Sequence, residues 1–210
     1  LSSVLVAVGE QFSQGMSRAN LSTFLSHPRG WPRIAKAIIK SKLGRRPLLP
    51  RDIWSLKGLT SAGMDSSVYR EKIKHYWGRY PLEVYGCAEM AMFALQTWDY
   101  EGMTFVPTLA FLEFIPEDEY RRSVEDKSYQ PRTLLLNELE AGHKYEMVPT
   151  SLQGGPFARY RIGDMIKVTS LRNERLDIYL PQVVFVSRVD GIIDIGGFTR
   201  LTEKTIWQAI

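Results

Sequence analysis

The sequence predicts an α/β (α+β) fold, in which a mixed sheet with flanking helices is joined to a β-rich subdomain. Three observations support this class. Apolar residues recur with helical spacing in the first part of the chain. Residues 53–89 then show the pattern of strand, turn, helix, strand and loop, which favours a sheet with ligands at the carboxyl ends of its strands. From residue 104 onward, short apolar runs typical of strands follow one another closely.

Length and composition are those of a globular protein with room for one large domain or two small ones. The chain has 210 residues, is 44% hydrophobic and carries a formal net charge of +4. No unbroken apolar run is long enough to span a bilayer, so we expect no membrane partner. The basic residues between Arg29 and Arg51 fit a solvated helix face, and we expect no nucleic-acid partner. Cys87 is the only cysteine, which fits the cytoplasm, and the three scattered histidines disfavour a zinc site.

The first third of the chain is expected to be mainly helical. Leu1–Glu10 lacks an initiator Met and a basic n-region, so we expect an interior segment of a longer chain and not a signal peptide. Residues 1–12 fit either a buried helix or a buried strand. The next helix has Pro32 in its first turn and Gly44 at its exit. Its predicted apolar face comprises Trp31, Ile34, Ala35, Ile38 and Ile39.

Residues 46–51 form a Pro-rich connection, residues 53–59 a possible strand, and residues 60–65 a turn of small residues. Asp65 or Ser66 can cap the helix that follows, and Gly78 ends that helix. Its predicted buried face comprises Tyr69, Ile73, Tyr76 and Trp77. Residues 82–85 are then expected to form a strand that leads into a loop at residues 86–89.

The second half is expected to be rich in strands. Residues 104–115 predict one buried strand, residues 116–130 a surface loop, and residues 132–137 and 144–150 two strands paired with each other. Residues 165–169 and 183–188 predict two further strands, and residues 192–195 a β-like run. Thr202 is expected to cap a last helix.

The stretch Phe157–Asp164 is the strongest candidate for chemistry. An arginine-rich strand end runs into Gly163 and then into a lone carboxylate at Asp164. A carboxylate in such a position can accept two hydrogen bonds from a vicinal diol, as on a ribose, and Gly163 permits a close approach. An ion pair of Asp164 with Arg159 or Arg161 beside a turn explains the same residues equally well.

Three motifs stand in a fixed order along the chain. They are Tyr85-Gly-Cys-Ala-Glu89, Tyr160-Arg-Ile-Gly-Asp164, and Phe185-Val-Ser-Arg-Val-Asp190 followed by Ile193-Asp-Ile-Gly-Gly-Phe-Thr-Arg200. Together they resemble the adenylate-forming superfamily, and most closely its auxin-responsive promoter family of acyl-acid amido synthetases. The resemblance covers most of the chain from Ile53 onward, and residues 139–164 are especially similar to that family.

The resemblance implies a role for each residue of the first motif. Tyr85 would lie against the adenine, with Gly86, Cys87 and Ala88 beside the nucleotide, and Glu89 would be a catalytic residue and magnesium ligand. The chain departs from the family pattern at Ala88, where a hydroxyl residue usually faces the α-phosphate.

The other motifs supply the remaining residues of the implied site. Asp164 would bind the two ribose hydroxyls, and Arg188 would be a catalytic and nucleotide-binding residue near the ribose or the phosphates. Gly63 matches a loop that borders the nucleotide and acid pocket. Asp190 would be the hinge between a large and a small domain.

The resemblance also implies a domain layout and an activity. Residues 1–190 would be the C-terminal part of the large N-terminal, nucleotide-binding domain, and residues 191–210 the hinge exit and the start of a small C-terminal domain. A phosphate loop upstream and a catalytic lysine downstream would lie outside this chain, so the fragment alone is expected to be inactive. The intact cytoplasmic enzyme would use ATP and Mg²⁺ to convert a small carboxylic acid into an acyl-adenylate, and would pass the acyl group to an amine, usually of an amino acid.

Two alternatives stay open. The acyl acceptor could be the thiol of coenzyme A, as in ligases of the phenylacetate type. The chain could also be a non-catalytic nucleotide-binding or scaffold domain, which the missing hydroxyl at Ala88 favours.

Overall fold

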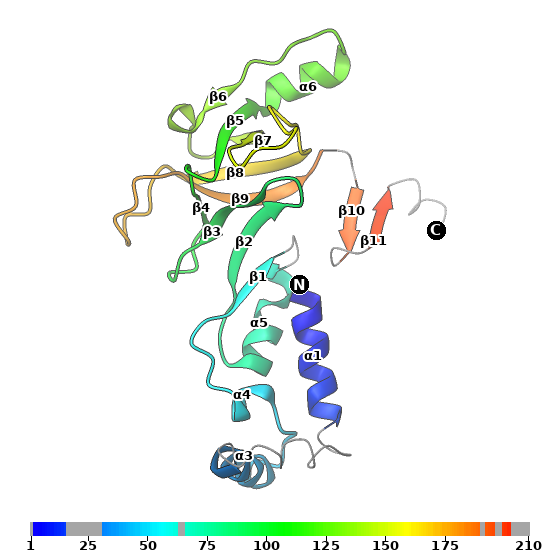
Figure 1. The fold of residues 1–210 in the computed structure, drawn as a ribbon, viewed down its shortest axis with the longest axis vertical. Helices are drawn as coiled ribbons and strands as arrows, with labels where there is room; N and C mark the ends of the chain where they lie inside the picture. The colour runs from blue at the N-terminus through cyan, green and yellow to red at the C-terminus, as the bar shows by residue number, and fades with distance from the viewer. Residues whose placement is uncertain (1, 16–30, 63–65, 190–191, 196–198, 203–210) are drawn as a thin grey trace. The chain divides into compact units, whose positions relative to one another are not determined.

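The computed structural model describes residues 2–15, 31–62, 66–189, 192–195 and 199–202, and the chain divides into two compact units (Figure 1). The first unit is Leu1–Pro81 and the second is Leu82–Ile210. The predicted α/β class with a β-rich part is confirmed. In the ranges that the structure describes, no helix combines the length and the hydrophobicity needed to cross a membrane.

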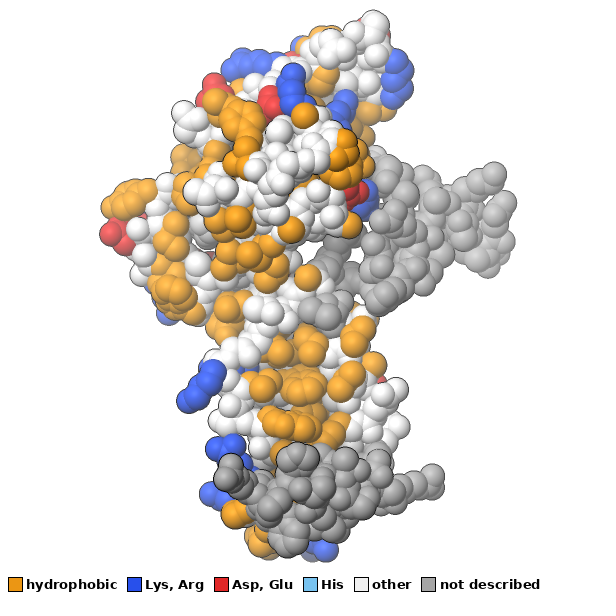
Figure 2. Space-filling view, in the orientation of Figure 1, with side chains coloured by type: hydrophobic (Ala, Val, Ile, Leu, Met, Phe, Trp, Pro, Cys, Tyr) orange, Lys and Arg blue, Asp and Glu red, His pale blue; other side chains and the backbone are white. Residues whose placement is uncertain are grey.

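The first unit is built mainly from helices that pack closely. Gly9 of α1 (Ser2–Gly15) lies so close to the ring of Tyr76 on α5 (Ser66–Trp77) that a Cβ atom at Gly9 would be 2.6 Å from the Tyr76 Cγ. The Trp77 indole N–H of α5 donates to the Leu5 carbonyl of α1 at 3.0 Å. Figure 2 shows hydrophobic side chains over α1 and α5, where Val4 and Val8 are exposed. The elements of this unit are α1 (Ser2–Gly15), α3 (Trp31–Leu43), α4 (Pro50–Ile53), β1 (Thr60–Ala62) and α5 (Ser66–Trp77).

The two predicted helices of this unit, α3 and α5, are confirmed. Of residues 1–12, left open between helix and strand, residues 2–12 belong to the helix α1, and Leu1 lies outside the described residues. The buried side of α3 differs from the predicted face, because Ala37 and Ser41 are buried whereas Ile39 is 59% exposed. In α5 the predicted face is correct at its centre, since Ile73 is fully buried, and Gly78 ends the helix with φ +79°.

The predicted strand at residues 53–59 is wrong. The short helix α4 ends at Ile53, residues 54–59 form neither helix nor strand, and the chain enters β1 only at Thr60, within the stretch predicted as a turn. The Asp52 carboxylate stabilises the start of α4, because it accepts a hydrogen bond from the Leu49 N–H at 3.0 Å and two from Arg46 at 2.7 Å. Residues 63–65 of the predicted turn lie outside the described residues.

The second unit contains an antiparallel sheet packed around a hydrophobic core. Its strands lie in the order β2-β3-β4-β9-β8-β7-β5-β6, and every neighbouring pair in this order is antiparallel. The bounds are β2 (Leu82–Cys87), β3 (Ala91–Gln96), β4 (Met103–Phe105), β5 (Ala110–Pro116), β6 (Leu134–Leu135), β7 (Lys144–Ser151), β8 (Asp164–Ser170) and β9 (Gln182–Arg188). Fully buried side chains of the core include Phe93, Phe114, Met147, Ile166, Val168 and Val183.

Among the described residues, the second unit contains four further elements. The helix α6 (Glu117–Glu125) packs against β5 and β7 (Figure 1). A 3₁₀ turn, η2 (Leu136–Glu138), follows β6. The strands β10 (Ile192–Ile195) and β11 (Thr199–Thr202) form a separate antiparallel pair.

Several predictions for the second unit need correction. The single strand at residues 104–115 is two strands, β4 and β5, separated by a turn at Pro107 in which the Leu109 N–H donates to the Val106 carbonyl. The surface loop at residues 116–130 contains α6, whose first turn, Glu117-Asp118-Glu119, is acidic and suits the positive end of a helix dipole. Residues 132–137 and 144–150 do not pair with each other, because β6 and β7 both pair with β5. The helix predicted after Thr202 lies outside the described residues.

Candidate functional site

The first motif forms the β2–β3 hairpin. Cys87 is in register with Ala91, and the turn between them is closed by the Met90 N–H, which donates to the Cys87 carbonyl at 3.3 Å. A Cβ atom at Gly86 would lie 2.2 Å from the Ala91 carbonyl oxygen, so only glycine fits this position. Ala88 and Glu89 lie on the turn, the first exposed and the second half-buried. The motif therefore presents its carboxylate at the tip of a tight hairpin.

Cys87 and Glu89 interact within this hairpin. Burial raises the pKa of the Cys87 thiol to about 11, and a hydrogen bond to the Glu89 carboxylate adds to the effect. A thiol with this pKa remains protonated near neutral pH and is a poor nucleophile. Cys87 is therefore part of the hairpin structure and not a reactive thiol.

The second and third motifs meet where β8 and β9 pair. Asp164 is in register with Arg188. The Arg188 Nη1 lies 3.5 Å from the Asp164 Oδ1, and its Nη2 donates to the Ile162 carbonyl at 3.0 Å. Beside them, the Val189 N–H donates to the Gly163 carbonyl at 2.8 Å. The start of β8 and the end of β9 thus hold an aspartate and an arginine next to each other.

Tyr85 of the first motif reaches the same place. Its hydroxyl donates to the Asp164 Oδ2 at 2.9 Å, and both side chains are buried. Burial, and next the charge of Asp164, raise the pKa of Tyr85 well above its ordinary value. The structure therefore brings together Tyr85, Asp164 and Arg188, one residue from each of the three motifs.

The alternative ion pair predicted for Asp164 is wrong in its partner. Arg159 pairs with Glu113 at 3.0 Å, and Arg161 makes hydrogen bonds to both carboxylate oxygens of Glu146. The cation beside Asp164 is Arg188, from a different strand. Asp164 is therefore ion-paired with Arg188 and also hydrogen-bonded to Tyr85.

Some predicted site residues cannot be placed, and some neighbours of the site were not predicted. Gly63 and Asp190 lie outside the described residues. Phe93 and Phe185 pack edge-on against Tyr85, with ring centroids 4.8 and 6.1 Å away. Phe185 opens the third motif and could have been found there, whereas nothing in the sequence around Phe93 distinguishes it from other core residues.

The one carboxylate of the first motif is compatible with a metal ion that a ligand brings with it. Glu89 offers a single hard carboxylate, and the described residues contain no cluster of three or more His, Cys, Asp or Glu suited to a metal ion. Mg²⁺ commonly binds through one or two carboxylates together with substrate phosphates, so one carboxylate is compatible with such a site.

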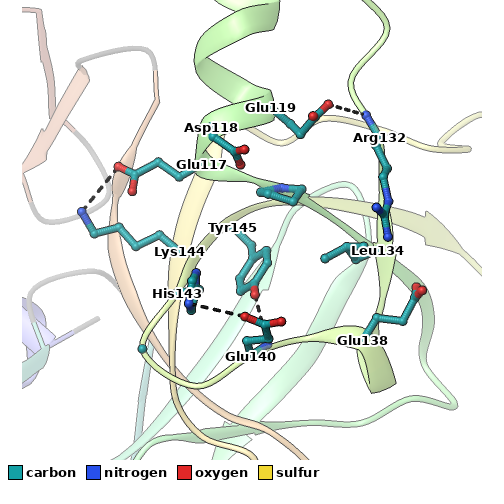
Figure 3. A pocket seen from close by; sticks show the side chains of 12 residues that line it. Glu117, Asp118, Glu119, Arg132, Leu134, Glu138, Glu140, His143, Lys144 and Tyr145 are labelled. Atoms are coloured by element: carbon teal, nitrogen blue, oxygen red, sulfur yellow. Dashed lines mark hydrogen bonds and ion pairs between the residues drawn. The ribbon is translucent and has the colours of Figure 1, made fainter.

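A pocket of about 620 Å³ lies elsewhere in the second unit, beneath the start of α6 (Figure 3). Figure 3 shows Lys144 reaching towards Glu117, and their ion pair measures 3.6 Å. The hydroxyl of Tyr145 accepts a hydrogen bond from the Glu140 N–H at 3.0 Å. None of the predicted nucleotide-site residues that the structure describes lines this pocket.

Comparison with known proteins identifies the central part of the chain. Residues 103–188 match the family model of the GH3 family central domain. The predicted resemblance is confirmed. The chain is 27% identical over 186 residues to indole-3-acetic acid-amido synthetase GH3.10 of Arabidopsis thaliana, a match that covers 82% of this chain and 30% of that protein. It is 29% identical over 159 residues to jasmonoyl–L-amino acid synthetase JAR4 of Nicotiana attenuata, covering 73% of this chain and 25% of the relative.

The fold of this chain also occurs among solved structures. An open conformation of 2-hydroxyisobutyryl-CoA ligase, in complex with 2-HIB-AMP and CoA, matches with a TM-score of 0.52 and 19% identity over 86% of this chain and 39% of the ligase. This likeness concerns the fold alone. The chain spans less than a third of the length of the two curated relatives above.

Proposed function

We propose that this chain is the nucleotide-binding part of a cytoplasmic, ATP-dependent ligase that activates a small carboxylic acid as an acyl-adenylate and transfers the acyl group to an amine, such as that of an amino acid. The observation that carries the proposal is the convergence of Tyr85, Asp164 and Arg188 at one place in the second unit. The GH3 match and the amido synthetases among the relatives support an amine as acceptor.

In this proposal each motif has a distinct task. Asp164 binds the ribose hydroxyls, and Arg188 is the catalytic cation near the ribose or phosphates. Gly86, Cys87 and Ala88 border the nucleotide beside Tyr85. Gly63 borders the nucleotide and acid pocket, Asp190 is the hinge, and residues 1–190 and 191–210 belong to the large and the small domain.

The chemistry requires charge stabilisation more than proton transfer. A carboxylate oxygen of the acid attacks the α-phosphorus of ATP, the bond to the pyrophosphate leaving group breaks, and negative charge builds on phosphate oxygens. Mg²⁺, which Glu89 would hold, neutralises part of that charge when it is bound. The guanidinium of Arg188 can supply positive charge nearby.

The proposal is tested by ATP–pyrophosphate exchange with the full-length protein over a panel of carboxylic acids. We expect at least one acid to support exchange, and we expect the 210-residue chain alone to support none. Absence of both exchange and ATP binding in the full-length protein would favour the scaffold alternative, which the exposed Ala88 supports because it offers no hydroxyl.

A second candidate function has coenzyme A as the acyl acceptor, and the fold match to a CoA ligase favours it. Mass spectrometry of the products with an amino-acid mixture or coenzyme A as acceptor separates the two. Amide products support the first proposal and thioester products support the second.

A further inference from the structure

The ring of Tyr85 is enclosed by the core of the second unit. Only 8% of the residue is exposed, and the rings of Phe93 and Phe185 pack against it at angles of 77° and 68°. Edge-to-face contacts of this kind are favourable in a core. The enclosed ring therefore leaves little surface on which an adenine could stack.

The hydroxyl of Tyr85, in contrast, has a specific partner. It donates to the Asp164 Oδ2 at 2.9 Å, from a strand 79 positions away in the sequence. Because burial raises the pKa of this phenol well above its ordinary value, the hydroxyl keeps its proton near neutral pH and remains a donor.

Asp164 is also constrained from the opposite strand. Arg188 lies 3.5 Å from the Asp164 Oδ1 and is itself tied to the Ile162 carbonyl by a hydrogen bond of 3.0 Å. The two carboxylate oxygens are thus contacted by groups from β2 and β9. A carboxylate held in this way has a defined plane, which matters for any ligand that must contact both of its oxygens.

We propose that Tyr85 is a positioning residue whose hydroxyl fixes the orientation of the Asp164 carboxylate for the ribose diol. This inference rests on the proposed function, in which Asp164 binds both ribose hydroxyls. Its distinctive consequence is that the Tyr85 hydroxyl affects the preference for ribose over deoxyribose, although it does not have to touch the nucleotide.

The test is Tyr85→Phe in the full-length protein, with dissociation constants for ATP, 2′-deoxy-ATP and 3′-deoxy-ATP measured by calorimetry. The wild type should prefer ATP. In the variant we expect ATP to bind about tenfold more weakly, as for loss of a hydrogen bond to a charged group, while binding of the deoxy nucleotides changes by less than about twofold. The preference for ribose should therefore shrink.

Tyr129→Phe is the matched control, because the Tyr129 hydroxyl also donates to a carboxylate, the Glu119 Oε2 at 2.7 Å, away from the three motifs. It should leave all three constants unchanged. Tyr85→Leu is a second variant that removes both the ring and the hydroxyl. Thermal unfolding of each variant shows which of them are folded, and either folded Tyr85 variant suffices for the test.

The possible results distinguish failure of the positioning role of Tyr85 from failure of the proposed ribose site at Asp164. Equal weakening of all three nucleotides by Tyr85→Phe or Tyr85→Leu would mean a contact with the base or a general loss of structure, and would overturn the positioning role. Unchanged constants in a folded variant would also overturn it. Failure of the wild type to bind ATP, or to prefer it over both deoxy nucleotides, would instead refute the proposed ribose site itself.

Discussion

Gly163 has a backbone conformation that other residues tolerate poorly. Its φ is +75°, and a Cβ atom there would lie 3.3 Å from the Val189 Cγ2. We expect Gly163→Ala to lower the free energy of unfolding by about 1–2 kcal/mol, because the left-handed conformation disfavours a side chain. Urea denaturation measures the effect. Gly142→Ala is the control for the cost of the left-handed backbone alone, because Gly142 has φ +89° with nothing near its Cβ position. An equal loss of stability in both variants would mean that the contact with Val189 adds nothing to that cost.

Glu89 occupies the tip of the β2–β3 hairpin, where a carboxylate can meet a metal carried by a nucleotide. We expect Glu89→Gln to raise the Mg²⁺ concentration needed for half-maximal pyrophosphate exchange by about tenfold, because an amide oxygen is a weaker ligand for a hard cation. Affinity for ATP without metal should hardly change. The exposed Glu125→Gln serves as the control, and an unmoved Mg²⁺ dependence in Glu89→Gln would assign Glu89 a purely structural role.

For individual residues, the sequence predicts which of them lie near the site but not which of them contact each other. Tyr85, Asp164 and Arg188 were all expected near the nucleotide, and the structure brings them together. The contact between Tyr85 and Asp164 could not be predicted, because it depends on strand register and on bulges at residues 85–86 and 165–166. Asp164 was expected to have an arginine from its own segment as the alternative partner, yet long-range pairing supplies Arg188.

Among the elements, α6 is linked to the sheet through Arg161. The Arg161 Nε donates to both carboxylate oxygens of Glu146 on β7, at 2.9 and 3.1 Å. Its Nη2 donates to the Glu146 Oε2 and, at 3.3 Å, to the Ser123 hydroxyl on α6. The Glu146 side chain is only 2% exposed. The ion pair therefore joins the segment of the second motif, the sheet and the helix.

Arg161→Met should destabilise the protein by about 3 kcal/mol, because it leaves the Glu146 carboxylate buried without its cation. Arg159→Met provides the comparison two residues away, where the arginine side chain is 64% exposed. Its partner Glu113 is also buried, but keeps a hydrogen bond from the Thr133 hydroxyl at 2.9 Å. For that variant we expect a loss of about 1 kcal/mol or less. Chemical denaturation measures the free energy of unfolding of both variants. Equal losses would show that the Arg161–Glu146 pair stabilises the protein no more than the Arg159–Glu113 pair.

The stabilisation that Asp52 gives to the start of α4 should be lost in acid. Two hydrogen bonds from Arg46 hold the pKa of Asp52 below its ordinary value of 3.8. A lowered pKa means that the ionised form stabilises the folded state above that ordinary value, and that this stabilisation disappears as the pH falls through the lower folded-state pKa. Wild type should therefore be more stable than Asp52→Asn near neutral pH, and the difference should narrow below pH 3.8. A difference that stays constant into acid, measured by urea denaturation, would contradict this assignment.

Element by element, the sequence predicts helices better than strand boundaries. Regular apolar spacing identified α3 and α5, whereas β4 and β5 were merged because apolar residues run through the Pro107 turn. The helix α6 was missed because its composition is polar and charged, so the acidic first turn was its main signal. Strand pairing was the hardest feature to predict, because β6 and β7 both pair with β5 through contacts that the local sequence does not encode.

For the whole molecule, strand order decides where the three motifs lie. In the sheet, β9 sits between β4 and β8, so the third motif lies next to the second although 20 or more residues separate them. The Tyr120 hydroxyl of α6 donates to the Val189 carbonyl at 3.2 Å, and the Val189 N–H is bonded to Gly163. The chain is thus firmly anchored in the second unit up to residue 189, immediately before the proposed hinge.

This anchoring makes Asp190 a specific target in the full-length protein. If the small domain rotates about Asp190 between the two half-reactions, Asp190→Pro should restrict that rotation by fixing φ near −65°. We expect acyl transfer to fall at least about tenfold more than adenylation, because closing motions that complete a second active conformation commonly limit one step. Pyrophosphate exchange reports adenylation, and single-turnover amide formation reports transfer.

Val189→Pro is the comparison, because it removes the N–H that bonds to Gly163 and should lower stability and both half-reactions together. Equal losses in the two half-reactions of Asp190→Pro, or none in either, would mean that the hinge lies elsewhere.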